Sequence, residues 1–315
     1  MTGTNRQHTT HLLRTEAHRL GFSFVGFAKA QPLDEEARRL EQWLHGGHHG
    51  KMAYMENHFD LRTDPTKLVP GAKSVVVLMH NYFPAEKQAD PEAPKLARYA
   101  YGEDYHFVLK KKLKRLLQFI RQEIGEVDGR CFVDSAPVME REWAHRAGLG
   151  WNGKNTLLIR PGAGSYFFLA ELILDLELAP DEPMRDHCGT CRRCIEACPT
   201  DAISPEGYLL DASRCISYLT IELREAIPPE FQDKMENWAF GCDICQEVCP
   251  WNRFSQPHDE PAFEPHPDLM KMTRREWTEI TEDVFNKIFT RSAVKRTKFA
   301  GLKRNLDFLS NKIIR

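Results

Sequence analysis

In the stretch Cys188-Gly-Thr-Cys191-Arg-Arg-Cys194-Ile-Glu-Ala-Cys198-Pro199, the cysteines are separated by two, two and three residues, and a proline follows the last one. A second run, Cys242-Asp-Ile-Cys245-Gln-Glu-Val-Cys249-Pro250, repeats the two-residue gap, the three-residue gap and the proline. Cys215 lies alone between the two runs. Eight of the nine cysteines therefore fall within 188–249, in a small module that we expect to span residues 179–255.

This spacing is typical of bacterial ferredoxins, in which three cysteines of the run hold one [4Fe–4S] cube and the fourth reaches a second cube. A two-residue gap wraps a tight loop around one corner of a cube, and a three-residue gap begins a helix that points away. Eight thiolates suffice for two four-iron cubes. We therefore predict that one cube is held by Cys188, Cys191, Cys194 and Cys249, and the other by Cys198, Cys215, Cys242 and Cys245.

Zinc and disulfide bonds are the alternatives for so many cysteines. Pairs of Cys-x2-Cys do bind zinc, but a three-cysteine run and two Cys-Pro endings are not zinc-ribbon spacing. Disulfides are rare in the cytoplasm, where we expect this chain because its first residues, MTGTNRQHTTHLL, resemble neither a cleaved signal nor a twin-arginine signal. We expect the ninth cysteine, Cys131, to be a buried apolar residue rather than a ligand.

Composition limits the class of protein. Of the 315 residues, 42% are hydrophobic and 28% are charged, which is ordinary for a globular protein and excludes global disorder. The most apolar stretch, 166–178, is interrupted by Glu171 and Asp175, so we expect no membrane partner. The net charge of −2 excludes a uniformly basic coat for nucleic acid.

The end of the chain has a different charge balance. The last 25 residues contain eight Lys or Arg and a single acid, Asp307. Residues 256–315 are expected to be a helical segment, with helical spacing at Trp277, Ile280, Val284 and Ile288. A basic run is usually a solvated face, but this one is also the best electrostatic candidate for phosphate contacts.

Residues 1–178 alternate between helical and strand patterns and are numerous enough for a domain with its own core. Helices are expected at 10–20, 34–44, 108–124 and 140–147, and strands at 22–27, 74–79, 131–133, 156–159 and 167–178. The fold class is therefore α+β: an α/β domain, the two-cluster module and a short helical tail. The helix at 108–124 carries a basic face, formed by Lys110, Lys111, Lys112, Lys114 and Arg115.

Three local signals in this domain have competing interpretations. Gly148-Leu-Gly150-Trp-Asn-Gly153 satisfies G-x-G-x-x-G, but it follows an expected helix and leads into an expected strand, the reverse of a dinucleotide site. We expect turns there, or close approach of the backbone to a flat ligand. Asp134 lies where a strand gives way to a turn, a frequent place for catalytic groups, although the pattern alone slightly favours helix capping. We expect His145 to be a structural histidine rather than a metal ligand.

Adjacent clusters move electrons singly and carry no substrate chemistry, so the first domain must hold a second cofactor or the substrate. Three of its motifs are informative: Arg98-Tyr-Ala-x-Gly-x-Asp104-Tyr-His106, Val133-Asp134-Ser-Ala-Pro137-Val-Met-Glu140, and Gly150-Trp-x-Gly-Lys154-Asn155-Thr-Leu-Leu158. In this order, and followed by the eight-cysteine module, they resemble the epoxyqueuosine reductases over nearly the whole chain.

The resemblance implies a cobalamin-dependent oxidoreductase that performs the last step of queuosine synthesis at the anticodon wobble position of tRNA. It implies a nitroreductase-like, cobalamin-binding first domain with cob(II)alamin as cofactor. The two [4Fe–4S] clusters would relay electrons from an external low-potential donor of the ferredoxin or flavodoxin type. The partner would be tRNA carrying epoxyqueuosine, and we expect the protein to act as a monomer.

The resemblance also implies roles for single residues. Asp134 would be the proton donor, a role that asks for a pKa raised by an apolar pocket. No Asp-x-His-x-x-Gly motif offers a histidine to cobalt, which is consistent with a base-off corrin. Positions that match the family's corrin contacts are Asn57, Ala97, Asp134, Leu158, Leu169, Ile216 and Gly241.

Three other functions compete with this one. A reductive dehalogenase shares cobalamin and two clusters, but such enzymes normally carry a twin-arginine signal. A ferredoxin-like electron carrier without its own substrate needs little beyond the cluster module, so residues 1–178 argue against it. A zinc-dependent RNA-binding protein would contain neither iron nor acid-labile sulfide.

Overall fold

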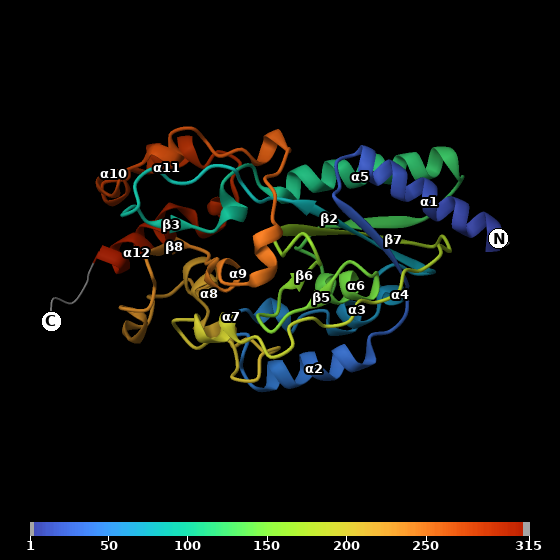
Figure 1. Ribbon diagram of the computed structural model, residues 1–315, viewed down its shortest axis with the longest axis horizontal. Helices are drawn as coiled ribbons and strands as arrows, with labels where there is room; N and C mark the ends of the chain where they lie inside the picture. The colour runs from blue at the N-terminus through green and yellow to red at the C-terminus, as the bar shows by residue number, and fades with distance from the viewer. Residues whose placement is uncertain (1–2, 311–315) are drawn as a thin grey trace.

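The computed structural model describes residues 3–310, and its largest layer is a four-stranded antiparallel sheet (Figure 1). The strand order is β1 (Phe24–Lys29), β2 (Ser74–Asn81), β7 (Phe167–Leu174) and β4 (Gly129–Phe132). The central pair β2–β7 runs from Ser74 opposite Leu174 to Asn81 opposite Phe167. Residues 74–80 of β2 are all buried because helices cover both faces of the sheet.

Helices α1 (Gly3–Arg19) and α5 (Tyr105–Glu123) cover one face, and α6 (Glu140–Arg146) covers the other (Figure 1). Helices α3 (Phe59–Thr63) and α4 (Pro65–Leu68) lie on the α6 side, and α2 (Asp34–His45) lies outside them. Side chains of β7 alternate between the faces, so Phe168 and Leu172 join the core under α5, while Leu169 and Ile173 join the core under α6. No helix among the described residues combines the length and apolarity needed to cross a membrane.

The remaining elements form a second body beside the sheet, which includes the cysteine module and the tail (Figure 1). Its helices are α7 (Arg193–Glu196), α8 (Ile216–Ile221), α9 (Ile244–Glu247), α10 (Arg274–Thr278), α11 (Glu282–Ile288) and α12 (Lys298–Ser310). Short 3₁₀ turns occur at Ala53–Met55, Arg98–Ala100, Ala212–Arg214, Pro229–Phe231, Pro250–Phe254, Pro261–Phe263, Leu269–Lys271 and Ala293–Thr297.

The first domain and the cysteine module share one small sheet and one core. Strand β3 (Lys95–Leu96) pairs in parallel with β8 (Trp238–Phe240). Leu96 and Phe240 belong to the same core as Trp277 from the tail. The division into residues 1–178, 179–255 and 256–315 stays a prediction, and the packing joins all three segments.

Two expectations from the sequence need correction. The single helix expected through Trp277, Ile280 and Val284 is two helices, because Thr281 caps α11 through its hydroxyl (3.3 Å from the Val284 N–H) and Val284 is 39% exposed. The last strand ends at Leu174 rather than 178. The other predicted helices and strands overlap observed elements, with ends that differ by up to seven residues.

The G-x-G-x-x-G segment makes turns, as predicted. It follows α6 and leads into a hairpin of β5 (Trp151–Asn152) and β6 (Leu158–Ile159). A Cβ atom on Gly150 would lie 2.3 Å from the Ile159 carbonyl oxygen, so glycine lets the hairpin close.

Candidate active site

Asp134 lies two residues after β4, at the end of the sheet, where the chain turns toward α6. Its φ of 53° is in the left-handed region, which non-glycine residues adopt rarely. Its N–H donates to Glu140 Oε1 (2.5 Å), and its carboxylate Oδ2 accepts from Tyr105 Oη (2.6 Å) and lies 3.3 Å from His106 Nε2. The helix-capping interpretation is wrong, because α6 begins after Met139 without a side-chain cap.

The partners of Asp134 come from the first turn of α5. Asp104 caps this helix by accepting from the His106 N–H (2.9 Å), and the same oxygen lies 2.7 Å from His106 Nδ1. Burial alone would lower the pKa of His106, but hydrogen bonds to Asp104 and Asp134 raise it to about 9. The imidazole is therefore a cation at neutral pH, held between two carboxylates. Tyr105 stacks on Phe168 with ring centroids 4.2 Å apart.

The predicted rise in the pKa of Asp134 is wrong for this structure. Burial favours the neutral acid, but hydrogen bonds from His106 and Tyr105 and the charges of His106 and Arg296 outweigh burial and lower the pKa. The carboxyl is therefore ionised at neutral pH. A proton that it delivers must first come from a neighbour, and His106 is a protonated neighbour in contact.

The carboxyl of Asp134 is exposed to solvent. Its side chain is 56% exposed, although burial is the largest influence on its pKa. Tyr54 (46% exposed) and Arg141 are also exposed side chains, and burial is likewise the largest influence on the pKa of each. The charges of Arg296 and Asp134 both affect the pKa of Tyr54, so these three side chains lie near one another.

Three of the residues predicted to contact a corrin lie together in the second body. Ala97 and Ile216 belong to one buried core. A Cβ on Gly241 would lie 2.5 Å from Ala97 Cβ, and Gly241 has a φ of 69°. Tyr99 connects this group to the catalytic turn, because its ring is next to Gly241 and 6.2 Å from the ring of Tyr105.

The other predicted corrin contacts lie elsewhere. Leu158 and the half-buried Leu169 both pack in the core under α6. Asn57 is exposed in the connection before α3 and joins neither group within the described residues.

The nine cysteines are all free, and the eight of the module lie in two sets. Burial and then the neighbouring thiols raise the pKa of Cys194 to about 11, and burial also raises the pKa values of Cys242 and Cys245. Because burial and neighbouring thiols disfavour the ionised form, four thiolates can lie together here only with positive charge between them, which iron supplies. The thiols that raise the pKa of Cys194 are Cys188, Cys249 and Cys191, whereas Cys215 and Cys198 raise the pKa of Cys242. The pKa of Cys245 is raised by Cys242 and Cys215 and also by Cys194 of the first set.

Within residues 3–310, no three His, Cys, Asp or Glu side chains converge on a position for a single metal ion. The thiolates of a cube bind different irons, so they need not converge. The β5–β6 hairpin supports the first set: Trp151 Nε1 donates to Cys188 Sγ (3.4 Å), and Lys154 Nζ donates to the carbonyl oxygens of Gly189 (2.6 Å) and Cys191 (3.0 Å).

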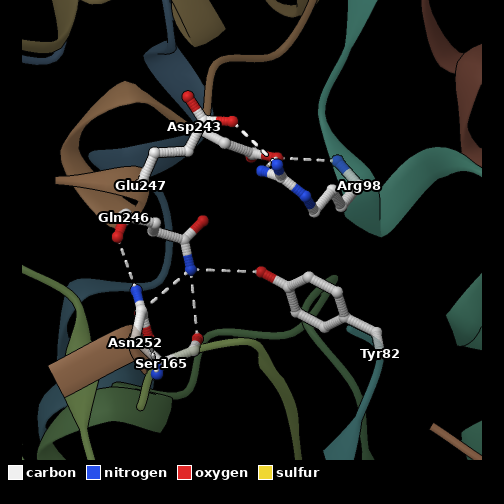
Figure 2. Close-up of polar contacts among 7 residues, drawn as sticks. All are labelled: Tyr82, Arg98, Ser165, Asp243, Gln246, Glu247 and Asn252. Carbon is white, nitrogen blue, oxygen red and sulfur yellow. Dashed lines mark hydrogen bonds and ion pairs between the residues drawn. The ribbon is translucent and has the colours of Figure 1, made fainter. Parts of the chain in front are cut away.

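A buried ion pair joins the first domain to α9 (Figure 2). The backbone N–H and Nη1 of Arg98 donate to Asp243 Oδ2 (2.9 and 3.1 Å), and Nη2 lies 2.8 Å from Glu247 Oε1. Asp243 is almost fully buried, and burial raises its pKa to about 6 despite Arg98. The segment at 98–106 therefore both lines the Asp134 site and holds the cysteine module.

A neutral network strengthens the same contact (Figure 2). Gln246 Nε2 donates to Tyr82 Oη (3.3 Å) and to Ser165 Oγ (3.1 Å). Asn252 Oδ1 accepts from the Ser165 N–H (2.7 Å), and Asn252 Nδ2 donates to the Gln246 carbonyl (2.7 Å). Directional bonds from both bodies fix their relative position.

Two other residues behave largely as the sequence predicts. His145 bonds to the Met184 carbonyl through Nε2 (3.0 Å) and lies 3.7 Å from Glu142, a structural arrangement. Cys131 packs against the core under α5 but is half-buried rather than fully buried, and burial raises the pKa of its thiol.

The basic tail is less available for phosphates than its composition indicates. Arg296 forms a double hydrogen bond with Glu222 (2.6 and 2.9 Å), Lys303 pairs with Asp307 (2.6 Å), and Arg291 pairs with Glu103. Arg304 donates to backbone carbonyls, and Lys312 and Arg315 lie outside the described residues. By contrast, no ion pair among the described residues engages four cations of α5: Lys110, Lys111, Lys114 and Arg115.

Residues 62–135 match the family model described as "Epoxyqueuosine reductase QueG, DUF1730", and residues 187–252 match a "4Fe-4S double cluster binding domain". The epoxyqueuosine reductase of Cellulophaga algicola is 59% identical over 97% of this chain and 99% of its own length. That of Cyclobacterium marinum is 61% identical over 96% of this chain and 97% of its own length. This chain belongs to the epoxyqueuosine reductase family.

Solved structures of epoxyqueuosine reductases share the fold. One, bound to an epoxyqueuosine-modified tRNA-Tyr stem loop, is 32% identical, with a TM-score of 0.88 over 96% of this chain and 80% of that one. Another, from Bacillus subtilis, has its catalytic aspartate loop swung out of the active site; it is 31% identical, with a TM-score of 0.87 over 96% of this chain and 81% of that one.

Membership in the epoxyqueuosine reductase family identifies the chain as an oxidoreductase of tRNA modification, as the motifs around Asp134 predicted. The module carries iron–sulfur clusters rather than zinc. The dehalogenase, stand-alone carrier and zinc interpretations are therefore set aside.

The structure adds residues that sequence reasoning missed. The motif at 98–106 indicated no role for Tyr105 or His106. The motif at 133–140 did not indicate that Glu140 accepts a hydrogen bond from the Asp134 N–H. Glu171 was noted only as an interruption in an apolar run. The available signal for Glu171 was a carboxylate in a strand whose other residues are all apolar, because a buried acid normally has a partner.

Proposed function

We propose that this chain reduces epoxyqueuosine at the wobble position of tRNA to queuosine, with cobalamin and two [4Fe–4S] clusters as cofactors. The observation that carries the proposal is the Asp134 turn, whose carboxyl is exposed to solvent, in a chain that also carries a module with eight thiols. A nitroreductase-like first domain would hold the corrin. An external ferredoxin- or flavodoxin-type donor would supply electrons to a monomer.

The residues present fit both cofactors. The two thiol sets are the ligands that we assign to the two cubes. For the corrin, Gly241 lets the backbone approach Ala97 closely, and Leu158 and the half-buried Leu169 supply an apolar surface in the core under α6. Bound cobalamin would supply the electron-rich cobalt that opens the epoxide, with electrons delivered through the clusters.

The reaction consumes two electrons and two protons, and it releases the epoxide oxygen as water as a carbon–carbon double bond forms. Protons are the part that this chain's own side chains handle. The Asp134 side chain is 56% exposed, and we assign its carboxyl the transfer of a proton to the epoxide oxygen. His106, a cation in contact with that oxygen, restores the proton to Asp134.

The decisive experiment is anaerobic reconstitution with cobalamin, iron and sulfide, followed by nucleoside analysis of epoxyqueuosine tRNA. We expect queuosine from the wild type and a loss of roughly 10²–10⁴-fold in kcat for Asp134→Asn, the range for removal of a general acid. Both proteins should retain the same iron and corrin content. A fully loaded wild type that makes no queuosine would exclude the function, and full turnover by Asp134→Asn would exclude the residue's role.

The tRNA is expected to dock on the exposed face of α5, which begins next to Asp134. Phe107 is 56% exposed there, and Lys111 and Lys114 continue along the same face, one helical turn apart. Removing one phosphate contact should lower the slope of log K against log salt by about 1. We expect this for Lys111→Glu and for Lys114→Glu, with kcat unchanged, and not for Lys29→Glu on the edge strand β1. Equal effects of all three would contradict docking on α5.

A further inference from the structure

Glu171 is an acid in the centre of the sheet. It lies on β7 between Val77 of β2 and Phe132 of β4, and its side chain is completely buried. Neither of its carboxyl oxygens has a hydrogen-bond donor among the described residues. An isolated buried carboxylate would be very costly, so Glu171 must be neutral and must place its proton on an acceptor.

That acceptor is the carboxyl of Glu140. Burial and then the charge of Glu140 raise the pKa of Glu171 well above its ordinary value, and the two carboxyl groups are within hydrogen-bonding reach. Burial likewise raises the pKa of Glu140 to about 7. Two adjacent buried carboxyls cannot both ionise, so they share one proton. Glu140 Oε1 also accepts the Asp134 N–H at 2.5 Å.

We propose that Glu140, backed by the buried carboxyl of Glu171, is a positioning residue that latches the Asp134 turn in place. The turn needs such a latch because Asp134 has a left-handed φ of 53°, a conformation that persists only where its surroundings hold it. Within the turn, the bonds from Ser135 N to the Val133 carbonyl and from Ala136 N to the Asp134 carbonyl join residues two apart. The bond from Asp134 to Glu140 therefore anchors the turn to α6.

The charges that face the pair come from four elements. Glu171 lies on β7 and Asp134 on the turn after β4, Tyr105 and His106 come from α5, and Arg141 follows Glu140 on α6. The negative charge of Asp134 favours a proton on the pair, and the positive charge of His106 opposes it. The latch is closed when Glu171 keeps its proton and Glu140 is ionised, and loss of the shared proton leaves two like charges that repel.

Amide hydrogen exchange of the segment 131–139 in the full-length, reconstituted protein reports the latch directly. Glu140→Ala removes the acceptor and should speed exchange by roughly 10- to 100-fold, as expected for one charge-assisted hydrogen bond. Glu171→Gln keeps a donor toward Glu140 and should stay within about twofold of wild type. Glu171→Met keeps the volume without the donor and should behave like Glu140→Ala. Glu142→Gln, two residues further along α6, is the matched control and should leave the exchange of 131–139 unchanged.

The pH dependence separates a shared proton from simple packing. After correction for intrinsic exchange, wild-type exchange of 131–139 should rise at alkaline pH, when the pair loses its proton. Glu171→Gln keeps Glu140 as the one titratable carboxyl of the pair and should lack this alkaline rise. Unchanged exchange in Glu140→Ala, or equal damage in Glu171→Gln and Glu171→Met, would overturn the proposal. If Glu140→Ala does not accumulate as folded protein, the comparison of Glu171→Gln with Glu171→Met decides alone.

The kinetic arm of the test rests on the proposed function. Loosening the turn should lower kcat for epoxyqueuosine reduction by a factor similar to the change in exchange, with KM for tRNA unchanged. A wild type without activity would refute the proposed function and leave the exchange result intact. Normal kcat in Glu140→Ala together with faster exchange would show that the latch does not serve this reaction and would overturn its assignment as a positioning residue.

Discussion

Replacing His106 by Gln removes the cation that lies between Asp104 and Asp134. The ring is 2.7 Å from one carboxylate and 3.3 Å from the other, and its side chain is 25% exposed, so solvent screens the interaction only in part. The pKa of about 9 compares with 6.5 for an ordinary histidine. At 1.36 kcal/mol for each pH unit, the charged ring contributes roughly 3 kcal/mol to folding, as an order of magnitude.

The sign of the pH dependence follows from the raised pKa. The stabilisation is fully present below about pH 6.5 and is lost as the pH rises through 9, where the folded protein releases the proton. Urea denaturation of wild type and His106→Gln at pH 6 and at pH 10 measures this difference. We expect wild type to be more stable by roughly 3 kcal/mol at pH 6 and by much less at pH 10.

Turnover gives a second measurement of the same proton. In wild type, kcat should fall as the pH rises through about 9, when His106 can no longer restore the proton of Asp134. His106→Gln should lack this limb and turn over more slowly at every pH. A stability difference that is the same at pH 6 and pH 10 would show that the ring is not charged between the carboxylates and would refute the reasoning.

Three further predictions concern the cofactor module and its surroundings. Trp151→Phe removes the N–H bond to Cys188 Sγ and should make the potential of that cluster more negative by roughly 40 mV, the equivalent of about 1 kcal/mol, as measured by redox titration. Gly241→Ala places a Cβ 2.5 Å from Ala97 Cβ at a positive φ, so lower thermal stability and weaker corrin retention are expected; a normal melting temperature would contradict this. Cys131→Ala should leave the iron and sulfide content unchanged, whereas loss of iron would mean that Cys131 is a ligand.

The sequence predicted the parts of this molecule that depend on local spacing. The gaps of two and three residues around Cys194 and Cys245 predicted an iron–sulfur module, because such loops have few conformations. The run at 74–79 foretold the buried strand β2. Asp134 was located at the end of a strand, since its motif joins a strand pattern to a helix pattern.

Contacts between distant segments were not predictable in this way. Nothing local at Leu96 indicates that it pairs beside Phe240. The charge of the tail alone predicted phosphate contacts, but Arg296 is paired with Glu222, which is 74 residues away in sequence. The pKa of Asp134 was misjudged for the same reason, because His106 and Tyr105 reach it from another element.

A lowered pKa does not remove Asp134 from proton transfer, because its neighbours hold protons at neutral pH. His106 keeps its proton up to about pH 9, and the pair formed by Glu140 and Glu171 shares one proton because two buried like charges are too costly. Among these groups, Asp134 is the one whose carboxylate is exposed to solvent. In the proposed reaction, an ionised carboxylate beside a protonated histidine would pass a proton to the substrate without storing it. The strained turn at Asp134 would then have a function, since it holds that carboxylate next to His106.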